Sequence, residues 1–228
     1  MTHKTNSRIA GITFIFYIAA GIASMTLFGK ATGGSGIAER LISAAEHTSI
    51  LGVSIILNLL CGLSAVVLAV TLYALTRDED REIALLGFAC RLGEGFIGAA
   101  NLPKTLGLLW LAKESTSLDA ATTNTFASMW LLPPGSYTIS ALFFAFGSTF
   151  FSYLFLRGQL IPVALAWLGV VASVLLLVVL PLQAAGFTRA GWWEWMPMLV
   201  FELVLAVWLI VKGVAAKGEQ NPSLNTAS

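Results

Sequence analysis

Three charged residues, Arg91, Glu94 and Glu202, stand in stretches that are otherwise apolar enough to cross a lipid bilayer. A charged side chain at the bilayer centre costs about 2.5–3.5 kcal/mol to insert, so such residues persist where they face a partner, water or a ligand. A guanidinium beside two carboxylates can hold a proton, attract a cation, or pair internally and only fix how the helices pack. We therefore interpret this charged set as the candidate site.

Polar residues continue from Arg91 along one face of the same segment. They recur at intervals of three and four residues, which is the spacing of one helix face. The stripe consists of Arg91, Glu94, Gly98, Asn101 and Thr105. Since a polar stripe in lipid must face the interior of a bundle, we expect partners from the second and fourth spans. These are Ser54, Asn58 and Cys61, and Ser136, Ser140 and Gly147. The predicted buried polar cluster comprises Arg91, Glu94, Glu202, Asn58 and Asn101.

The helical rise places the three charges at one depth. At about 1.5 Å per residue, Arg91 and Glu94 lie roughly 12 and 16 Å from one bilayer boundary, and Glu202 about 14 Å from the same boundary. A dry site resists an uncompensated negative charge, so we expect a protonated carboxylate, or else a cation or ligand ammonium that completes the balance. Glu202 is the candidate for the protonated group, because Glu94 lies one turn from Arg91 on the same helix.

The elements that must position this cluster follow from composition. Hydrophobic residues make up 57% of the chain and charged residues 11%, and the mean hydropathy is +0.83. A bilayer core takes about 20 apolar residues per helix, and six runs supply them. The runs are 9–28, 50–75, 83–111, 137–156, 160–182 and 195–211. They predict an all-α integral membrane protein with a single six-transmembrane-helix bundle over residues 1–228, which ends in a polar tail at 214–228.

Basic residues set the expected orientation. An even number of spans puts both termini on one side, and that side carries slightly more Lys and Arg, which favours cytoplasmic termini. The first run could instead be a signal peptide, but its length and the absence of a clean cleavage site favour an uncleaved helix. The net charge of +1 gives no reason to expect nucleic acid as a partner. We expect lipid, and a small ligand or ion.

Several connections carry local signals. Residues 37–45 have the apolar spacing of a short amphipathic helix. Pro103 predicts a kink or break near Asn101, because proline removes a helical hydrogen bond. The Pro133-Pro134-Gly135 sequence should stop any helix before the fourth span.

Catalytic and metal-binding patterns are largely missing. The only histidines are His3 and His47, which excludes haem held by paired histidines and a His-Glu-x-x-His zinc motif. We therefore expect no metal site and no cofactor, and we assign no catalytic residue. His47 is the only candidate base for a nucleophilic serine, so an enzyme is the least favoured class.

Several short sequences along the chain resemble a bacterial membrane family known as domain of unknown function 4386. The most specific part combines Arg91-x-x-Glu94 with Glu202 and the closing sequence 208–213, Trp-Leu-Ile-Val-Lys-Gly. Further likeness lies in residues 8–11, 72–73, 160–162 and 168–169. The resemblance implies a multipass protein of the bacterial cytoplasmic (inner) membrane. It implies no activity, substrate or catalytic residue.

Three hypotheses follow. In the first, the polar interior binds or transports a proton, a cation or a small amphiphile. In the second, the protein is a structural or regulatory membrane subunit whose charges only fix helix packing, which a closed core would favour. In the third, the protein is a membrane enzyme, which requires a cavity that brings His47 to a serine or a carboxylate.

Overall fold

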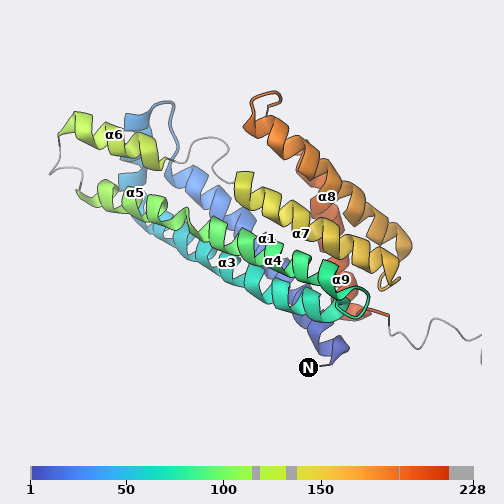
Figure 1. The fold of residues 1–228 in the computed structure, drawn as a ribbon. Coiled ribbons are helices and arrows are strands. Elements are labelled where there is room, and N and C mark those ends of the chain that lie inside the picture. The colour runs from blue at the N-terminus through green and yellow to red at the C-terminus, as the bar shows by residue number, and fades with distance from the viewer. Residues whose placement is uncertain (1, 115–118, 132–137, 190, 216–228) are drawn as a thin grey trace, which may run out of the picture.

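The computed structural model describes residues 2–114, 119–131, 138–189 and 191–215, and within these ranges the regular structure is helical, with no strand (Figure 1). Six helical stretches are long and apolar enough to cross a membrane. They are His3–Ala31, Thr48–Thr76, Arg81–Lys113, Thr138–Arg157, Val163–Ala184 and Trp193–Val211. The predicted all-helical architecture with six apolar spans is therefore confirmed. The predicted Pro133-Pro134-Gly135 helix stop, Ser136 and the end of the polar tail lie outside the described residues.

The spans form a ring in chain order. Helix α1 (His3–Ala31) packs on α3 (Thr48–Thr76), α3 on α4 (Arg81–Ala99), and α4 on α7 (Thr138–Arg157). In turn α7 packs on α8 (Val163–Ala184), α8 on α9 (Met196–Val211), and α9 on α1. Ring closure creates an interior that is shared by all six spans and shielded from the surroundings, and the main hydrophobic core lies there.

Small residues allow neighbouring helices to approach closely. A methyl group added at Gly95 would lie 3.0 Å from the carbonyl oxygen of Gly62, and one added at Gly11 would lie 2.6 Å from that of Ala206. Such contacts between backbones tighten helix packing without bulky side chains. The Gly95 contact draws α3 against α4 beside the charged residues.

The third span is broken, as Pro103 predicted. Helix α4 ends at Ala99, and α5 (Leu102–Glu114) begins three residues later. The amide of Asn101 donates to the carbonyl of Gly98 at 3.2 Å, a tighter turn than an α-helix makes. Proline has no amide hydrogen to continue the ladder, so the helix restarts beyond Asn101.

A smaller unit, which we call the cap, covers one end of the ring. It consists of α2 (Ile37–Glu46), α5 and α6 (Ala120–Trp130), and its own core includes Leu51, Leu108 and Leu111 (Figure 1, left). The sequence predicted α2 but not α6. Helix α6 is short. Asp119 caps it by accepting the amide of Thr122 at 2.9 Å, and Ala127 packs in the core of the cap.

The opposite end of the bundle gathers the start of α1 and the end of α9. The amide of Ala215 donates to the carbonyl of Leu160 at 3.0 Å. Arg157 donates to Asp80 at 2.8 Å, and Asp80 also caps α4. The fifth span begins at Val163 rather than residue 160, because Pro162 precedes the helix and leaves Leu160 in the connection.

Candidate functional site

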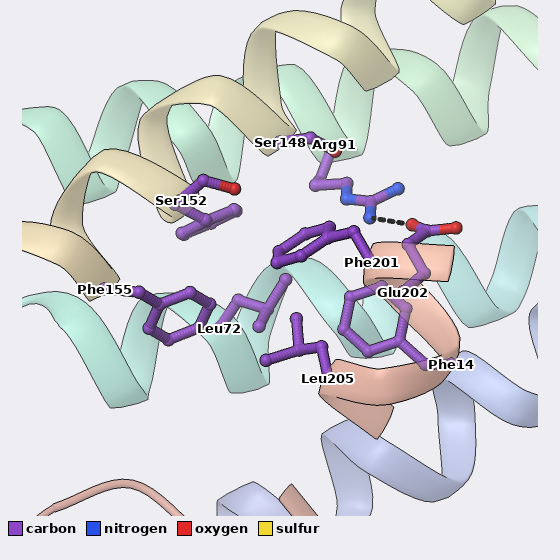
Figure 2. Close-up of a pocket in the computed structure, with 10 residues that line it drawn as sticks. Phe14, Leu72, Arg91, Ser148, Ser152, Phe155, Phe201, Glu202 and Leu205 are labelled. Atoms are coloured by element: carbon purple, nitrogen blue, oxygen red, sulfur yellow. Dashed lines mark hydrogen bonds and ion pairs between the residues drawn. The ribbon is translucent and has the colours of Figure 1, made fainter. Parts of the chain in front are cut away.

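Arg91 lies inside the ring and joins two helices through its guanidinium. Its side chain is 1% exposed. Nη1 donates to Oε2 of Glu94 at 2.7 Å on the same helix, and Nη2 donates to Oε1 of Glu202 at 3.3 Å on α9 (Figure 2). The structure thus brings together the three charged residues that the sequence singled out. We call this set the charge cluster.

Glu94 has hydrogen bonds to both carboxylate oxygens. The hydroxyl of Tyr17 on α1 donates to Oε1 at 2.5 Å, while Arg91 occupies Oε2. In addition, the hydroxyl of Ser140 on α7 donates to the backbone carbonyl of Glu94 at 3.0 Å. Three helices besides α4 therefore contact the charge cluster, and Glu94 is held from two of them.

Glu202 is bonded less completely than Glu94. Its Oε1 accepts from Arg91 over 3.3 Å, and no hydrogen bond to Oε2 joins it to the part of the chain that the structure describes. The side chain is nevertheless only 7% exposed. The two carboxylates around Arg91 are therefore unequal, and Oε2 of Glu202, which has no hydrogen bond to the described residues, can carry a proton.

Aromatic rings surround the guanidinium. Its central carbon lies 4.7 Å from the ring centroid of Phe144, 5.6 Å from that of Phe14 and 6.0 Å from that of Tyr17. The electron-rich faces of aromatic rings attract a cation, and this attraction is strongest where water is excluded. The aromatic surroundings therefore offset part of the cost of burying Arg91.

Sequence analysis missed Tyr17, Phe14 and Phe144. Phe14 and Tyr17 are three residues apart and share one helix face, but aromatic residues are ordinary in apolar helices. Only the tyrosine hydroxyl, a polar group in the middle of the first span, could have served as a signal.

A small cavity lies beside Arg91 and Glu202. It measures about 10 Å³, roughly the room that one water molecule requires. Ser148 and Ser152 of α7 line it together with apolar side chains (Figure 2). Two buried polar atoms on its lining residues, Nε of Arg91 and Oγ of Ser152, have no hydrogen-bond partner within the described ranges.

The remaining predicted residues continue the polar stripe toward the cap. Asn101 is buried at the helix break, and Thr105 donates to its carbonyl at 3.5 Å. Asn58 is half-buried on α3. In the described part of the chain, no hydrogen bond joins either asparagine to the charge cluster.

Catalytic and metal chemistry have little support in the described residues. They contain no group of three His, Cys, Asp or Glu side chains that could hold a metal ion. His47 lies at the end of α2, where its Nδ1 contacts the carbonyl of Ser43 at 2.9 Å. That contact belongs to the cap and brings no serine hydroxyl or carboxylate to the imidazole.

The charges in the cluster do not cancel. One guanidinium stands against two carboxylates, which leaves a net negative charge if both are ionised. In a buried site such an excess is costly, and a proton is the smallest species that removes it. The arrangement is therefore suited to proton binding, or to a fixed ion pair in which one carboxyl stays neutral.

A family whose description reads domain of unknown function (DUF4386) matches residues 9–213 of the chain. No curated protein and no solved structure matches it significantly. The matched range includes all three residues of the charge cluster.

Proposed function

The chain belongs to the family of domain of unknown function 4386, and from that premise we propose that it is a multipass membrane protein that binds a proton at its charge cluster. The observation that carries the proposal is a single buried guanidinium bonded to two buried carboxylates, one of which keeps an oxygen without a hydrogen bond to the described residues. Proton uptake by Glu202 balances the charge while Arg91 stays paired with Glu94.

The outward faces of the six spans support placement in a membrane. They expose large apolar side chains, which soluble proteins rarely gather over so wide a surface. Examples with half or more of the residue exposed, one from each span, are Ile12, Ile56, Leu85, Ile139, Val171 and Val207. Lipid is the proposed partner of these faces, and a bacterial cytoplasmic membrane is the proposed location.

Basic residues support cytoplasmic termini. The end of the bundle where α1 begins and α9 finishes carries several arginine and lysine side chains, and loops with such an excess usually remain in the cytoplasm. The residues are Lys4, Arg8, Arg77, Arg81, Arg157 and Lys212. In this orientation the cap faces the opposite side of the membrane.

The size of the cavity favours a proton over the other ligands considered. A space of about 10 Å³ accepts one water molecule but no amphiphile. A metal cation would also lie beside Arg91, whose own positive charge repels it. A proton needs no cavity of its own, since it is held on a carboxylate oxygen.

A structural role is the second candidate, and the closed state of the cluster favours it. Arg91 is 1% exposed and is bonded to both glutamates, so these contacts could serve only to fix how α4 and α9 pack. In that case the protein would be a structural or regulatory membrane subunit.

Infrared spectroscopy distinguishes the two candidates. We expect a protonated carboxyl band in the purified wild-type protein at neutral pH. The band should disappear in Glu202→Gln, which removes the carboxyl group itself. It should also disappear in Glu94→Gln, because Glu202 is then the one cluster carboxylate that faces Arg91 and it no longer needs a proton. The control is Glu194→Gln, because Glu194 lies outside the ring and accepts a hydrogen bond from Gly191. If the wild type has no such band and both cluster variants are merely less stable, the cluster is a structural ion pair.

A further inference from the structure

The surroundings of the two carboxylates differ in their access to water. Glu94 is enclosed by the Tyr17 hydroxyl, Arg91 and the close approach of Gly95 to Gly62. Glu202 instead lines the small cavity together with Arg91 and two serines of α7 (Figure 2). Glu202 therefore borders a space that can hold an exchange partner for its proton, whereas Glu94 does not line this cavity.

The cavity has the properties of a buried water site. Such a site needs room for one molecule and two to four polar groups that can bond it. Nε of Arg91 offers a donor, and Oγ of Ser152, which is 1% exposed, can accept or donate. Ser148 and the Glu202 carboxyl also line the cavity. A bound water gives both unpartnered atoms a hydrogen bond, which is the usual state of buried polar groups.

We infer that one water molecule occupies this cavity, bonded to Nε of Arg91 and Oγ of Ser152, and that it exchanges protons with Glu202. The carboxyl O–H bond breaks as its proton passes to the water oxygen, and the water returns one of its own protons to the carboxylate. Neither group changes its net charge over the cycle. This inference rests on the proposed proton on Glu202, and it adds the route by which that proton is replaced.

Hydrogen–deuterium exchange of the carboxyl band tests the inference. On transfer into heavy water, the band of Glu202 should shift at a rate that follows the occupancy of the water site. In Ser152→Ala the water has one hydrogen bond fewer, so the exchange rate should fall about fivefold. Removing a hydroxyl that has no partner among the described residues should not prevent folding.

Ser173→Ala is the matched control. Ser173 is also fully buried, but its hydroxyl donates to the carbonyl of Gly169 at 2.7 Å within α8 and does not line the cavity. In Ser173→Ala the Glu202 carboxyl band should exchange at the same rate as in the wild type. Ser152→Cys, which keeps a weak hydrogen-bonding group, should give an intermediate rate.

The outcomes separate the two claims. If the band is present and exchanges equally fast in Ser152→Ala and the wild type, the water site is overturned while the proton on Glu202 stands. If the same slowing appears in Ser173→Ala, the effect is general loosening, and the inference is again overturned. Absence of the band from the wild type overturns both the proposed function and the water site.

Discussion

The charge cluster and the cap are built on opposite principles. The cluster brings ionisable groups from α4 and α9 together inside the ring, with Tyr17 of α1 as a third contributor. The cap is held by an apolar core around Leu108 and Leu111, and its polar groups satisfy local helix ends. The cluster therefore depends more than the cap does on polar contacts between residues that are far apart in the sequence.

This difference shows where each region is vulnerable. A buried charge whose partner is removed carries its full desolvation cost, so damage in the cluster affects every helix that contributes to it. Truncating an apolar side chain in the cap leaves a hole, and the damage stays near that hole. The same helical span supplies both regions, and the break at Asn101 lies between them.

Removing Arg91 should have the largest effect. In Arg91→Met two carboxyl groups, at least one of them charged, remain buried without their cation, and the free energy of unfolding in detergent micelles should fall by about 3–5 kcal/mol. The triple variant that also carries Glu94→Gln and Glu202→Gln removes the stranded charges, so it should restore most of that stability. Equal instability of the single and triple variants would show that charge balance is not what the cluster requires.

Leu108→Ala should have a smaller effect that is confined to the cap. Leu108 is fully buried, and the cavity left by its truncation should cost about 3 kcal/mol locally. Backbone amide exchange should speed up in α2, α5 and α6 and stay unchanged in α8 and α9. The control is Leu106→Ala on the same helix, since Leu106 is 50% exposed. Faster exchange throughout the ring would instead mean that cap and cluster form one cooperative unit.

Asp80→Asn should have the smallest effect and a distinct pH dependence. The backbone amide of Ile83, followed by Arg157, holds the pKa of Asp80 below its usual range. Its stabilising contribution is therefore present at neutral pH and disappears as the pH falls through that lowered pKa. The Tm of the variant should lie slightly below that of the wild type at pH 7 and converge with it in acid.

Arg157→Gln provides the control for that prediction, because it removes the ionic partner and leaves the helix cap in place. In the Arg157→Gln background, Asp80→Asn should lower the Tm by less than it does in the wild-type background. A difference in Tm that stays constant from neutral to acid pH would exclude the carboxylate charge as its source.

The sequence predicted the parts of the fold that depend on local chemistry. Long apolar runs specify helices of spanning length, and Pro103 specifies a break, because each effect acts within a few residues. Helix α6 escaped prediction because its core contacts come from other segments. The start of α8 at Val163 differed because the apolar run continues through Leu160 and Ile161, which are buried outside the helix.

For the candidate site as well, some features followed from the sequence and others only from the tertiary structure. By itself, the sequence determined that Arg91, Glu94 and Glu202 share one depth and that they need partners, since burial of charge is costly wherever it occurs. Only the tertiary structure decided that the Tyr17 hydroxyl bonds Glu94, and that Ser152 and Glu202 line the same cavity. The physical reason is that these outcomes depend on helix rotation and neighbour choice around the ring, which involve residues far apart in the chain.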